Sequence, residues 1–421
     1  MKKVLFGSKK IVAVLMTVLM LATALMPAVF ATGSWLDESR LMADRYLTGY
    51  NTYNLVGGVV ERQMVLNNAK KNNQIKCYIT EVDLNNPDIS VFAGYSDGDI
   101  DEWKSTTVKE QAKALESKGY NVVAAVNGGP FNTSTGEPSD VLVMNGVVCH
   151  TGSMYPFFAI LNDGTPVIRP VGGSLDNVKE AVAGMRILIA DGKILDLSDD
   201  PSRHPRTAVG IKADGSLVFM VVDGRQQPET LGMVYTDLAH TMFALGCVDA
   251  MALDGGGSSI MLTQREATDD LVVRSSPSYA GIERPVATSI QICTSATPSG
   301  VFDHVAFSVD KIFCAPLTPT SFNVFGVDKN GFKTDIPGNG YLEVADSSLG
   351  SISGSTFMPS SKTGKTTINY VIDGEVVASL PVEVTKEADD LFTAFFKEIY
   401  QAFANIFNLI RTFFEKIGER I

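Results

Sequence analysis

The stretch Leu217-Val218-Phe219-Met220-Val221-Val222-Asp223-Gly224-Arg225 decides how the rest of the chain is interpreted. Its first six residues are apolar and predict a strand, and an acid and an arginine follow where that strand ends. Another apolar run, Ala208 to Ile211, precedes it, and the Asp214-Gly215 pair between the two runs is a hairpin signal. The pattern therefore predicts a hairpin with charged residues at the end of its second strand.

Apolar runs and turn signals continue on both sides of this hairpin. Val122 to Val126 is apolar throughout and suits a strand covered on both faces, whereas Ile75 to Val82 alternates like a half-buried strand. Two segments have helical composition, Ser105 to Lys118 and Thr236 to Leu245, and a glycine follows each of them. We therefore predict an α+β fold, with a mixed, mainly antiparallel sheet and helices in the main domain.

The chain has 421 residues, 45% of them hydrophobic, and is too long for one average domain. A linker rich in Ser, Thr, Pro and Gly lies around Thr294 to Gly300. The segment after it has short alternating strands and no helical period, which predicts a small all-β Ig-like sandwich. The predicted segments are a signal peptide (1–31), a lead-in that packs on the main domain (32–74), the main domain (75–297), the sandwich (301–385) and an amphipathic helix (389–421).

The first thirty-one residues have the pattern of an export signal. Four lysines precede an apolar run from Ile11 to Met26, and Val29-Phe30-Ala31 offers small residues at the processing positions. An uncleaved membrane anchor is the alternative, because the run is close to the lower length limit for a span. Removing the four lysines changes the formal net charge from −12 to −16. We therefore expect a secreted or cell-surface protein, and its acidic surface argues against nucleic acid as a partner.

The segment 389–421 carries an apolar stripe at helical spacing. Phe392, Phe396, Ile399 and Phe403 begin a series in which steps of four and three alternate, as in a heptad seam. We expect this helix to associate with itself or to lie in a membrane interface. Packing back onto its own sandwich is the alternative.

Several well-known signatures of metal and nucleotide sites are missing from the sequence. The five cysteines show no CxxC spacing, and an odd number leaves at least one of them unpaired. Neither an HExxH motif nor a Walker-type loop occurs, and there is no Gly-x-Ser-x-Gly elbow between a strand and a helix. We therefore predict no metal and no other cofactor.

The run Leu253-Asp254-Gly255-Gly256-Gly257-Ser258-Ser259 is the second place where chemistry is concentrated. Three glycines allow a turn with positive φ, which brings backbone N–H groups close to a ligand and can form an anion cradle. Asp254 would then be a carboxylate at the rim of that cradle. A tight turn in which the aspartate accepts backbone hydrogen bonds is the alternative.

Arginines stand in three further motifs. Arg206, Arg225 and Arg284 can each give planar, doubly donating contacts to a phosphodiester. Structural pairing with Asp223 and Asp254 is the alternative for each arginine. His204, next to Pro205, either orients a phosphate or caps a turn.

Taken in order, five motifs resemble the phosphodiester glycosidase family over about residues 75–295. They are Asn127-Gly128-Gly129-Pro130-Phe131, Arg203-His204-Pro205-Arg206-Thr207-Ala208-Val209-Gly210, Asp223-Gly224-Arg225, Leu253-Asp254-Gly255-Gly256-Gly257-Ser258-Ser259 and Arg284-Pro285-Val286. The resemblance implies hydrolysis of a sugar-phosphate diester to a free sugar and a phosphomonoester. It also implies a pocket with a polar lining of Asn127, Arg206, Asp223, Arg225, Asp254 and Arg284, without fixing their roles.

We predict Asp254 as acid or nucleophile with Asp223 as its partner, because a carboxylate stabilises the oxocarbenium-like centre that forms when phosphate leaves. The expected substrate is a sugar phosphate within a cell-wall or extracellular polysaccharide. Two alternatives are a non-catalytic protein that binds wall phosphosugars and a metal-dependent phosphoesterase that cuts the P–O bond. The residues predicted to bind substrate or phosphate are Asn127, His204, Arg206, Arg225, Gly255, Gly256, Gly257, Ser258 and Arg284.

Overall fold

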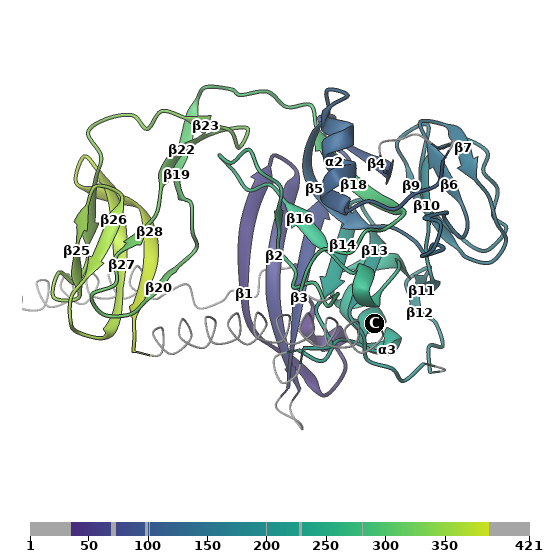
Figure 1. Cartoon of the computed structure of the whole chain (residues 1–421), viewed down its shortest axis with the longest axis horizontal. Helices are drawn as coiled ribbons and strands as arrows, with labels where there is room; N and C mark the ends of the chain where they lie inside the picture. The colour runs from purple at the N-terminus through teal and green to yellow at the C-terminus, as the bar shows by residue number, and fades with distance from the viewer. Residues whose placement is uncertain are drawn as a thin grey trace, which may run out of the picture.

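The computed structural model describes residues 35–68, 73–96, 100, 102–198, 200–226, 230–279 and 281–386. The predicted signal peptide (1–31) and the predicted amphipathic helix (389–421) lie outside these residues. The described part contains strands β1 to β28, the α-helices α2 and α3 and two 3-10 helices, η1 (Glu38–Arg40) and η2 (Gly256–Ser258). Figure 1 shows how they are arranged.

An eight-stranded antiparallel sheet forms the centre of the fold, with the order β1-β2-β3-β14-β13-β15-β11-β12. The predicted hairpin is part of it, because β13 and β14 pair from Arg206↔Val222 to Ile211↔Leu217. Its strands are β1 (Arg45–Val56), β2 (Val59–Asn68), β3 (Gln74–Val82), β11 (Arg186–Ala190), β12 (Lys193–Ile194), β13 (Arg206–Lys212), β14 (Leu217–Val222) and β15 (Cys247–Ala252).

The central sheet is covered on both faces. Successive residues of a strand point to opposite faces, so Val221 packs into one hydrophobic core and Val222 into another. The first core is shared with a five-stranded sheet of order β17-β16-β5-β18-β4, and the second with α3. The five strands are β4 (Ile89–Tyr95), β5 (Asn121–Asn127), β16 (Met261–Thr263), β17 (Val272–Val273) and β18 (Thr288–Thr294).

Both predicted helices are present. Helix α2 (Val108–Glu116) starts at Thr107, whose hydroxyl accepts from the Glu110 N–H while the Glu110 carboxylate accepts from the Thr107 N–H. This capping box satisfies two of the free donors at the helix start. Helix α3 (Tyr235–Ala244) is followed by Gly246, which has φ +90° and ends the helix.

A third sheet, of order β7-β6-β10-β8-β9, lies at one end of the molecule (Figure 1). Its first hairpin turns at Asn145 and Gly146, both with positive φ, as the Asn-Gly signal predicts. Its strands are β6 (Leu142–Met144), β7 (Val147–His150), β8 (Phe157–Leu161), β9 (Pro166–Arg169) and β10 (Val178–Ala183).

Residues 302–384, the C-terminal module, form three small sheets at the opposite end (Figure 1). They have a core of their own, in which Phe322, Phe357 and Ile368 pack together. An Ig-like identity for this module stays a prediction. Its strands are β19 (Phe302–Phe307), β20 (Ile312–Cys314), β21 (Thr320–Ser321), β22 (Val324–Asp328), β23 (Lys333–Thr334), β24 (Tyr341–Val344), β25 (Gly350–Ser353), β26 (Thr356–Pro359), β27 (Gly364–Ile372) and β28 (Glu375–Val384).

The predicted α+β class is wrong. The described residues form a mostly β protein, in which two short helices accompany many antiparallel strands. The sequence misleads partly because β1 and the first half of β2 are polar at many positions, as suits a strand that has exposed residues along its length. The lead-in predicted at residues 32–74 contains both strands, and residues 45–68 pair as two long strands of the central sheet.

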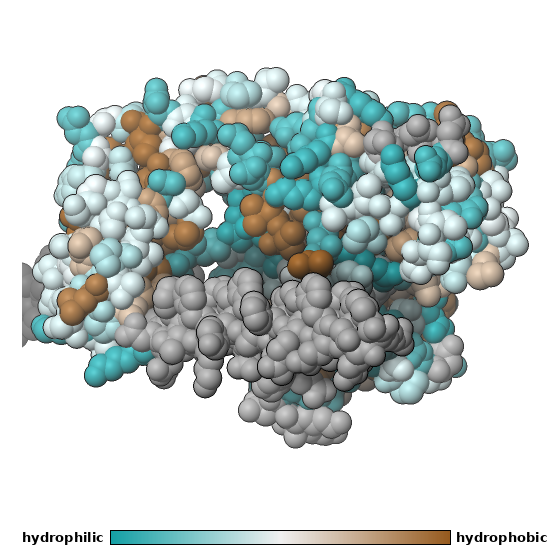
Figure 2. Space-filling view, in the orientation of Figure 1, coloured by the Kyte–Doolittle hydropathy of each residue, from teal (hydrophilic) through white to brown (hydrophobic). Residues whose placement is uncertain are grey.

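Among the described residues, none of the helices has the length and apolar character needed to cross a membrane. On the face in Figure 2, apolar side chains form separate small patches between hydrophilic ones. All five cysteines are free thiols; Cys77, Cys247, Cys293 and Cys314 are buried and Cys149 is half-buried.

Candidate functional site

The strand-end motifs meet at one edge of the central sheet. Strands β14 and β15 both lie antiparallel to β13, which runs between them, so β14 and β15 end where β13 begins. Asp223, Arg206 and Asp254 therefore share this edge. Two strand spacings separate β14 from β15, which amounts to about 10 Å.

Asp254 lies just beyond the end of β15 with its backbone fixed on both sides. Its N–H donates to the Gly128 carbonyl at 3.0 Å, and its carbonyl accepts from Asn127 Nδ2 at 2.8 Å. Its Oδ1 accepts from the Gly255 N–H at 2.9 Å. Burial raises the pKa of Asp254, and the Ser258 hydroxyl, the Gly255 N–H and the positive charge of Arg284 counteract part of that rise. The result is a half-buried aspartate with an arginine and a hydroxyl beside it.

The glycine turn is shaped around Arg225. Gly256 has φ +62°, and a Cβ added to it would lie 3.1 Å from Nη2 of Arg225. Arg225 itself has φ +61°, a conformation that costs a non-glycine residue about 1 kcal/mol or more. Such strained backbone is often found at functional sites. The N–H groups of Gly255 and Gly256 donate to Asp254 Oδ1 and to the Pro205 carbonyl, so the fold itself uses these two amides.

Arg284 approaches the same turn from the start of β18. Its Nη1 donates to Ser258 Oγ at 3.3 Å, and Ser258 is 1% exposed. The guanidinium carbon lies 5.2 Å from the centre of the Phe131 ring and 5.9 Å from that of Tyr279. These three side chains line a hollow of about 270 Å³ together with Ser105, Thr133 and Pro285. The sequence gives no signal for Tyr279, which stands in a loop of serine and proline.

Arg225 and Arg284 differ from most arginines of the protein in their pairing. Neither makes an ion pair with a carboxylate within the described residues. Arg225 is exposed and Arg284 is half-buried. An arginine that lacks such a partner keeps its charge and most of its five donors for a ligand. One cation of this kind lies against Gly256, and the other lies against Gly257.

His204 touches Arg225. Its Nδ1 accepts from Arg225 Nη2 at 3.1 Å, which leaves the ring proton of a neutral His204 on Nε2. Burial, together with the charges of Arg225 and Arg206, lowers the pKa of His204. The lowered pKa favours the neutral form of His204, which can donate one hydrogen bond from Nε2.

Arg206 and Asn127 are held inside the fold. Arg206 is 6% exposed, donates to the carbonyls of Met233 and Ser202, pairs with Asp200 at 3.3 Å and lies over the Tyr235 ring. Its guanidinium group is buried and already paired with a carboxylate and two carbonyl groups, so this location does not favour the predicted phosphate contact.

Asn127 is fully buried at the end of β5 and ties four segments together. Its Oδ1 accepts from Thr207 Oγ1 and from the Ile260 N–H, and its Nδ2 donates to Asp254 and Gly128. Every polar atom of the side chain thus serves to position the turn around Asp254. Asn127 supports the site rather than faces a ligand.

Asp223 has an environment separate from that of Asp254. Its Oδ1 accepts from the Ser276 N–H at 2.8 Å, and the carboxylate lies near Tyr78 and Lys76 of β3. Burial raises the pKa of Asp223 to about 6, while Ser276, Tyr78 and Lys76 act in the opposite direction. No hydrogen bond joins the two aspartates in the described part of the chain, and each carboxylate has its own set of neighbours.

The residues that the structure brings together are Asp254, the turn Gly255–Ser258, Arg225, Arg284 and His204. Within the described residues, no group of three or more His, Cys, Asp and Glu side chains is arranged to hold a metal ion. The site therefore consists of one half-buried aspartate and two arginines around a glycine turn.

Comparison with known proteins covers the same region. Residues 120–293 match the family model of the phosphodiester glycosidases. This match confirms the resemblance seen in the motifs, and the matched residues take in all five of them.

Individual relatives are distant. The SPbeta prophage-derived uncharacterized protein YomE of Bacillus subtilis is 34% identical over 90 residues, which are 21% of this chain and only 13% of that protein. The catalytic domain of zebrafish N-acetylglucosamine-1-phosphodiester alpha-N-acetylglucosaminidase, auto-inhibited by its pro-peptide, is 20% identical with a TM-score of 0.45; the similarity covers 59% of this chain and 88% of that one. A hypothetical protein from Synechocystis is 12% identical with a TM-score of 0.43, over 58% of this chain and 64% of its own.

Proposed function

We propose that this protein hydrolyses a sugar 1-phosphodiester and releases the free sugar and a phosphomonoester. One observation carries the proposal: two arginines without a carboxylate partner among the described residues lie against a glycine turn, and a half-buried aspartate begins that turn. Planar guanidinium groups match the oxygens of a phosphate, and a carboxylate matches the positive charge that develops on a sugar ring. The phosphodiester glycosidase match over residues 120–293 supports the same chemistry.

The phosphate would lie over Gly256 and Gly257, between Arg225 and Arg284. When the bond between C1 and oxygen breaks, the electron pair leaves with the phosphate, and its charge is stabilised by the two guanidinium groups. Phosphate held by two guanidinium groups is a good leaving group, so one carboxylate is enough to stabilise the charge on the sugar ring.

Asp254 would face the anomeric carbon. As a carboxylate it stabilises the oxocarbenium-like centre or bonds to it, and a water molecule then supplies the hydroxyl group of the free sugar. Asn127 and Ser258 act through Asp254: Asn127 fixes its backbone, and Ser258 lies between its carboxylate and Arg284. Neutral His204 would donate from Nε2 to a phosphate oxygen.

The substrate we propose is a cell-wall or extracellular polysaccharide that contains sugar 1-phosphate links, and the place of action is outside the cell or at its surface. The export pattern of residues 1–31 and the acidic composition support this location. Detection of the chain by antibody in the growth medium and in the wall fraction tests this location. Detection in the cytosol alone would contradict it.

The activity is tested with the full chain and a panel of sugar 1-(methyl phosphate) diesters. We expect release of free sugar and methyl phosphate by the wild type and none by Asp254→Asn, which keeps the size of the side chain and removes its charge. Release of sugar 1-phosphate and methanol would contradict the proposal and favour a phosphoesterase. Binding of the diesters with no turnover would favour a non-catalytic binding protein.

A further inference from the structure

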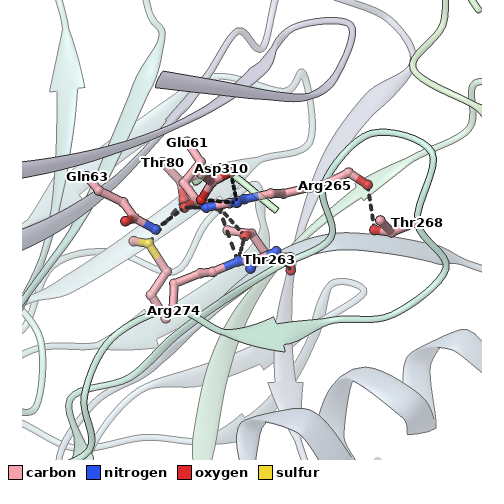
Figure 3. Close-up of polar contacts among 9 residues, drawn as sticks. Glu61, Gln63, Thr80, Thr263, Arg265, Thr268, Arg274 and Asp310 are labelled. Atoms are coloured by element: carbon pink, nitrogen blue, oxygen red, sulfur yellow. Dashed lines mark hydrogen bonds and ion pairs between the residues drawn. The ribbon is translucent and has the colours of Figure 1, made fainter. Parts of the chain in front are cut away.

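A buried network of charges lies away from the candidate site, where β2 meets the β16–β17 hairpin (Figure 3). Glu61 is fully buried, and its carboxylate accepts from Gln63 Nε2 at 2.7 Å, from Arg265 Nη2 at 3.2 Å and from the Thr263 hydroxyl. Arg274 pairs with it at 3.4 Å and also donates to Thr263 Oγ1 at 2.8 Å. One carboxylate thus contacts both strands of the hairpin.

The same hairpin carries the candidate site at its other end. Its first strand, β16, follows directly after η2 and the Gly255–Ser258 turn, and its second strand, β17, leads into residues 275–279. Both ends are joined, because the Met261 N–H donates to Ser275 Oγ and the Ser278 hydroxyl donates to the Gly256 carbonyl. A displacement of the hairpin therefore moves the glycine turn and the loop that carries Tyr279 together.

The tip of the hairpin, residues 264–268, docks on the C-terminal module. Arg265 Nη1 lies 2.7 Å from both carboxylate oxygens of Asp310. Two further links are the ion pair of Glu266 with His304 at 3.2 Å and the hydrogen bond from the Ala267 N–H to the Gly331 carbonyl at 2.9 Å. Arg265 also lies over the Tyr53 ring, with its Cζ 3.5 Å from the ring centre.

Arg265 contacts both parts at once. Its guanidinium group contacts Glu61, which is inside the catalytic region, and Asp310, which belongs to the C-terminal module. A fully buried carboxylate such as Glu61 needs partners that stay in place, because an unpaired buried charge is strongly unfavourable. The position of Asp310 therefore restrains Arg265, and Arg265 restrains the hairpin.

We propose that the C-terminal module positions the candidate site through Asp310, Arg265 and Glu61 without touching the substrate. Asp310 and Glu61 are then positioning residues, and loss of the Asp310 carboxylate loosens the turn around Gly256. The part of this inference that concerns activity rests on the proposed glycosidase function. The part that concerns mobility of the turn does not.

The test uses the full chain with Asp310→Asn, which is safe for folding because the Asp310 side chain is 42% exposed. Glu383→Gln is the matched control, since Glu383 pairs with Lys311 and Lys365 inside the module and not with the hairpin. Hydrogen–deuterium exchange is measured at residues 255–260 and 274–279, and turnover is measured on the best sugar phosphodiester.

For Asp310→Asn we expect faster exchange in both segments and a fall in kcat of about two- to fivefold, the effect that a partly exposed ion pair can have, with KM nearly unchanged. Asp310→Glu restores the carboxylate and should restore both measurements, whereas Glu383→Gln should change neither. Unchanged exchange in Asp310→Asn, or an equal change in Glu383→Gln, overturns the proposal. If the wild type releases no sugar, the proposed function fails and the exchange measurements still decide the coupling.

Discussion

The guanidinium group of Arg225 lies against Gly256, so close that a Cβ at position 256 would come within 3.1 Å of Nη2. Both residues have positive φ, +61° for Arg225 and +62° for Gly256. The backbone of Arg225 is thus strained, and Gly256 has no side chain. Together these two features allow the guanidinium group of Arg225 to lie on the turn. This relationship explains why a glycine is required at position 256.

Gly256→Ala should reduce activity far more than it reduces stability. A methyl group at position 256 pushes Arg225 away from the place where the phosphate binds, and the positive φ adds about 1 kcal/mol of strain. Gly215→Ala is the matched control, because Gly215 has φ +84° and a Cβ added there would meet nothing within 4 Å. We expect similar losses of Tm in both variants and a loss of kcat/KM of at least tenfold only in Gly256→Ala. Equal activities would show that the approach of Arg225 to the turn has no role.

Lysine substitutions should separate the arginines that bind phosphate from the one that supports the fold. Arg225→Lys and Arg284→Lys keep the charge but lose the paired donors, so KM should rise about tenfold or more while Tm stays near that of the wild type. Arg206→Lys breaks contacts with Met233, Ser202 and Asp200 and should lower Tm instead. Steady-state kinetics and calorimetry check both expectations. A rise in KM for Arg206→Lys with unchanged Tm would place that residue in the binding site after all.

The pH dependence of activity should follow Asp254. Because burial raises its pKa, the carboxylate form is lost as pH falls through a value above the ordinary 3.8, and kcat/KM should fall with it. Ser258→Ala removes a hydroxyl that lowers this pKa, so the acidic limb of the profile should move to higher pH. Ser259→Ala, the buried neighbour, is the control and should leave the limb in place. A limb that stays fixed in Ser258→Ala would argue that another group controls activity.

Stability should depend on pH through Asp223. Its pKa is raised from 3.8 to about 6 in the folded protein, so the folded state favours the protonated form and loses stability as pH rises between these values. Asp223→Asn is neutral at every pH and should therefore gain stability over the wild type on going from pH 4 to pH 7.5, by about 2–3 kcal/mol. Urea unfolding at the two pH values measures this gain. The same difference in unfolding free energy at both would contradict it.

Much of the local structure could be predicted from the sequence. The hairpin of β13 and β14, the Asn145-Gly146 turn and both helices follow from apolar runs, helical composition and turn residues, which act over a few residues. The rest of the fold could not be predicted in this way. Strand β1 has exposed or half-buried residues at most positions, and its place in the sheet comes from pairing with β2 rather than from its own pattern.

The candidate site was predictable in its parts but not in its arrangement. The sequence places an acid at the end of β14 and another after β15, and only the strand order shows that β13 separates them. Asp223 therefore has Ser276 and Tyr78 as neighbours instead of Asp254. Arg206 belongs to the same motif as His204, yet its side chain turns into the fold towards Asp200 and Met233. Such differences depend on contacts between residues far apart in the chain.

Hydrolysis in water enriched in oxygen-18, followed by mass spectrometry of both products, tests the central claim most directly. If Asp254 acts on the anomeric carbon while Arg225 and Arg284 hold the phosphate, the C–O bond breaks and the label appears in the free sugar. Label in the phosphomonoester would mean that water attacks phosphorus, and the proposed roles of Asp254 and the two arginines would then be wrong.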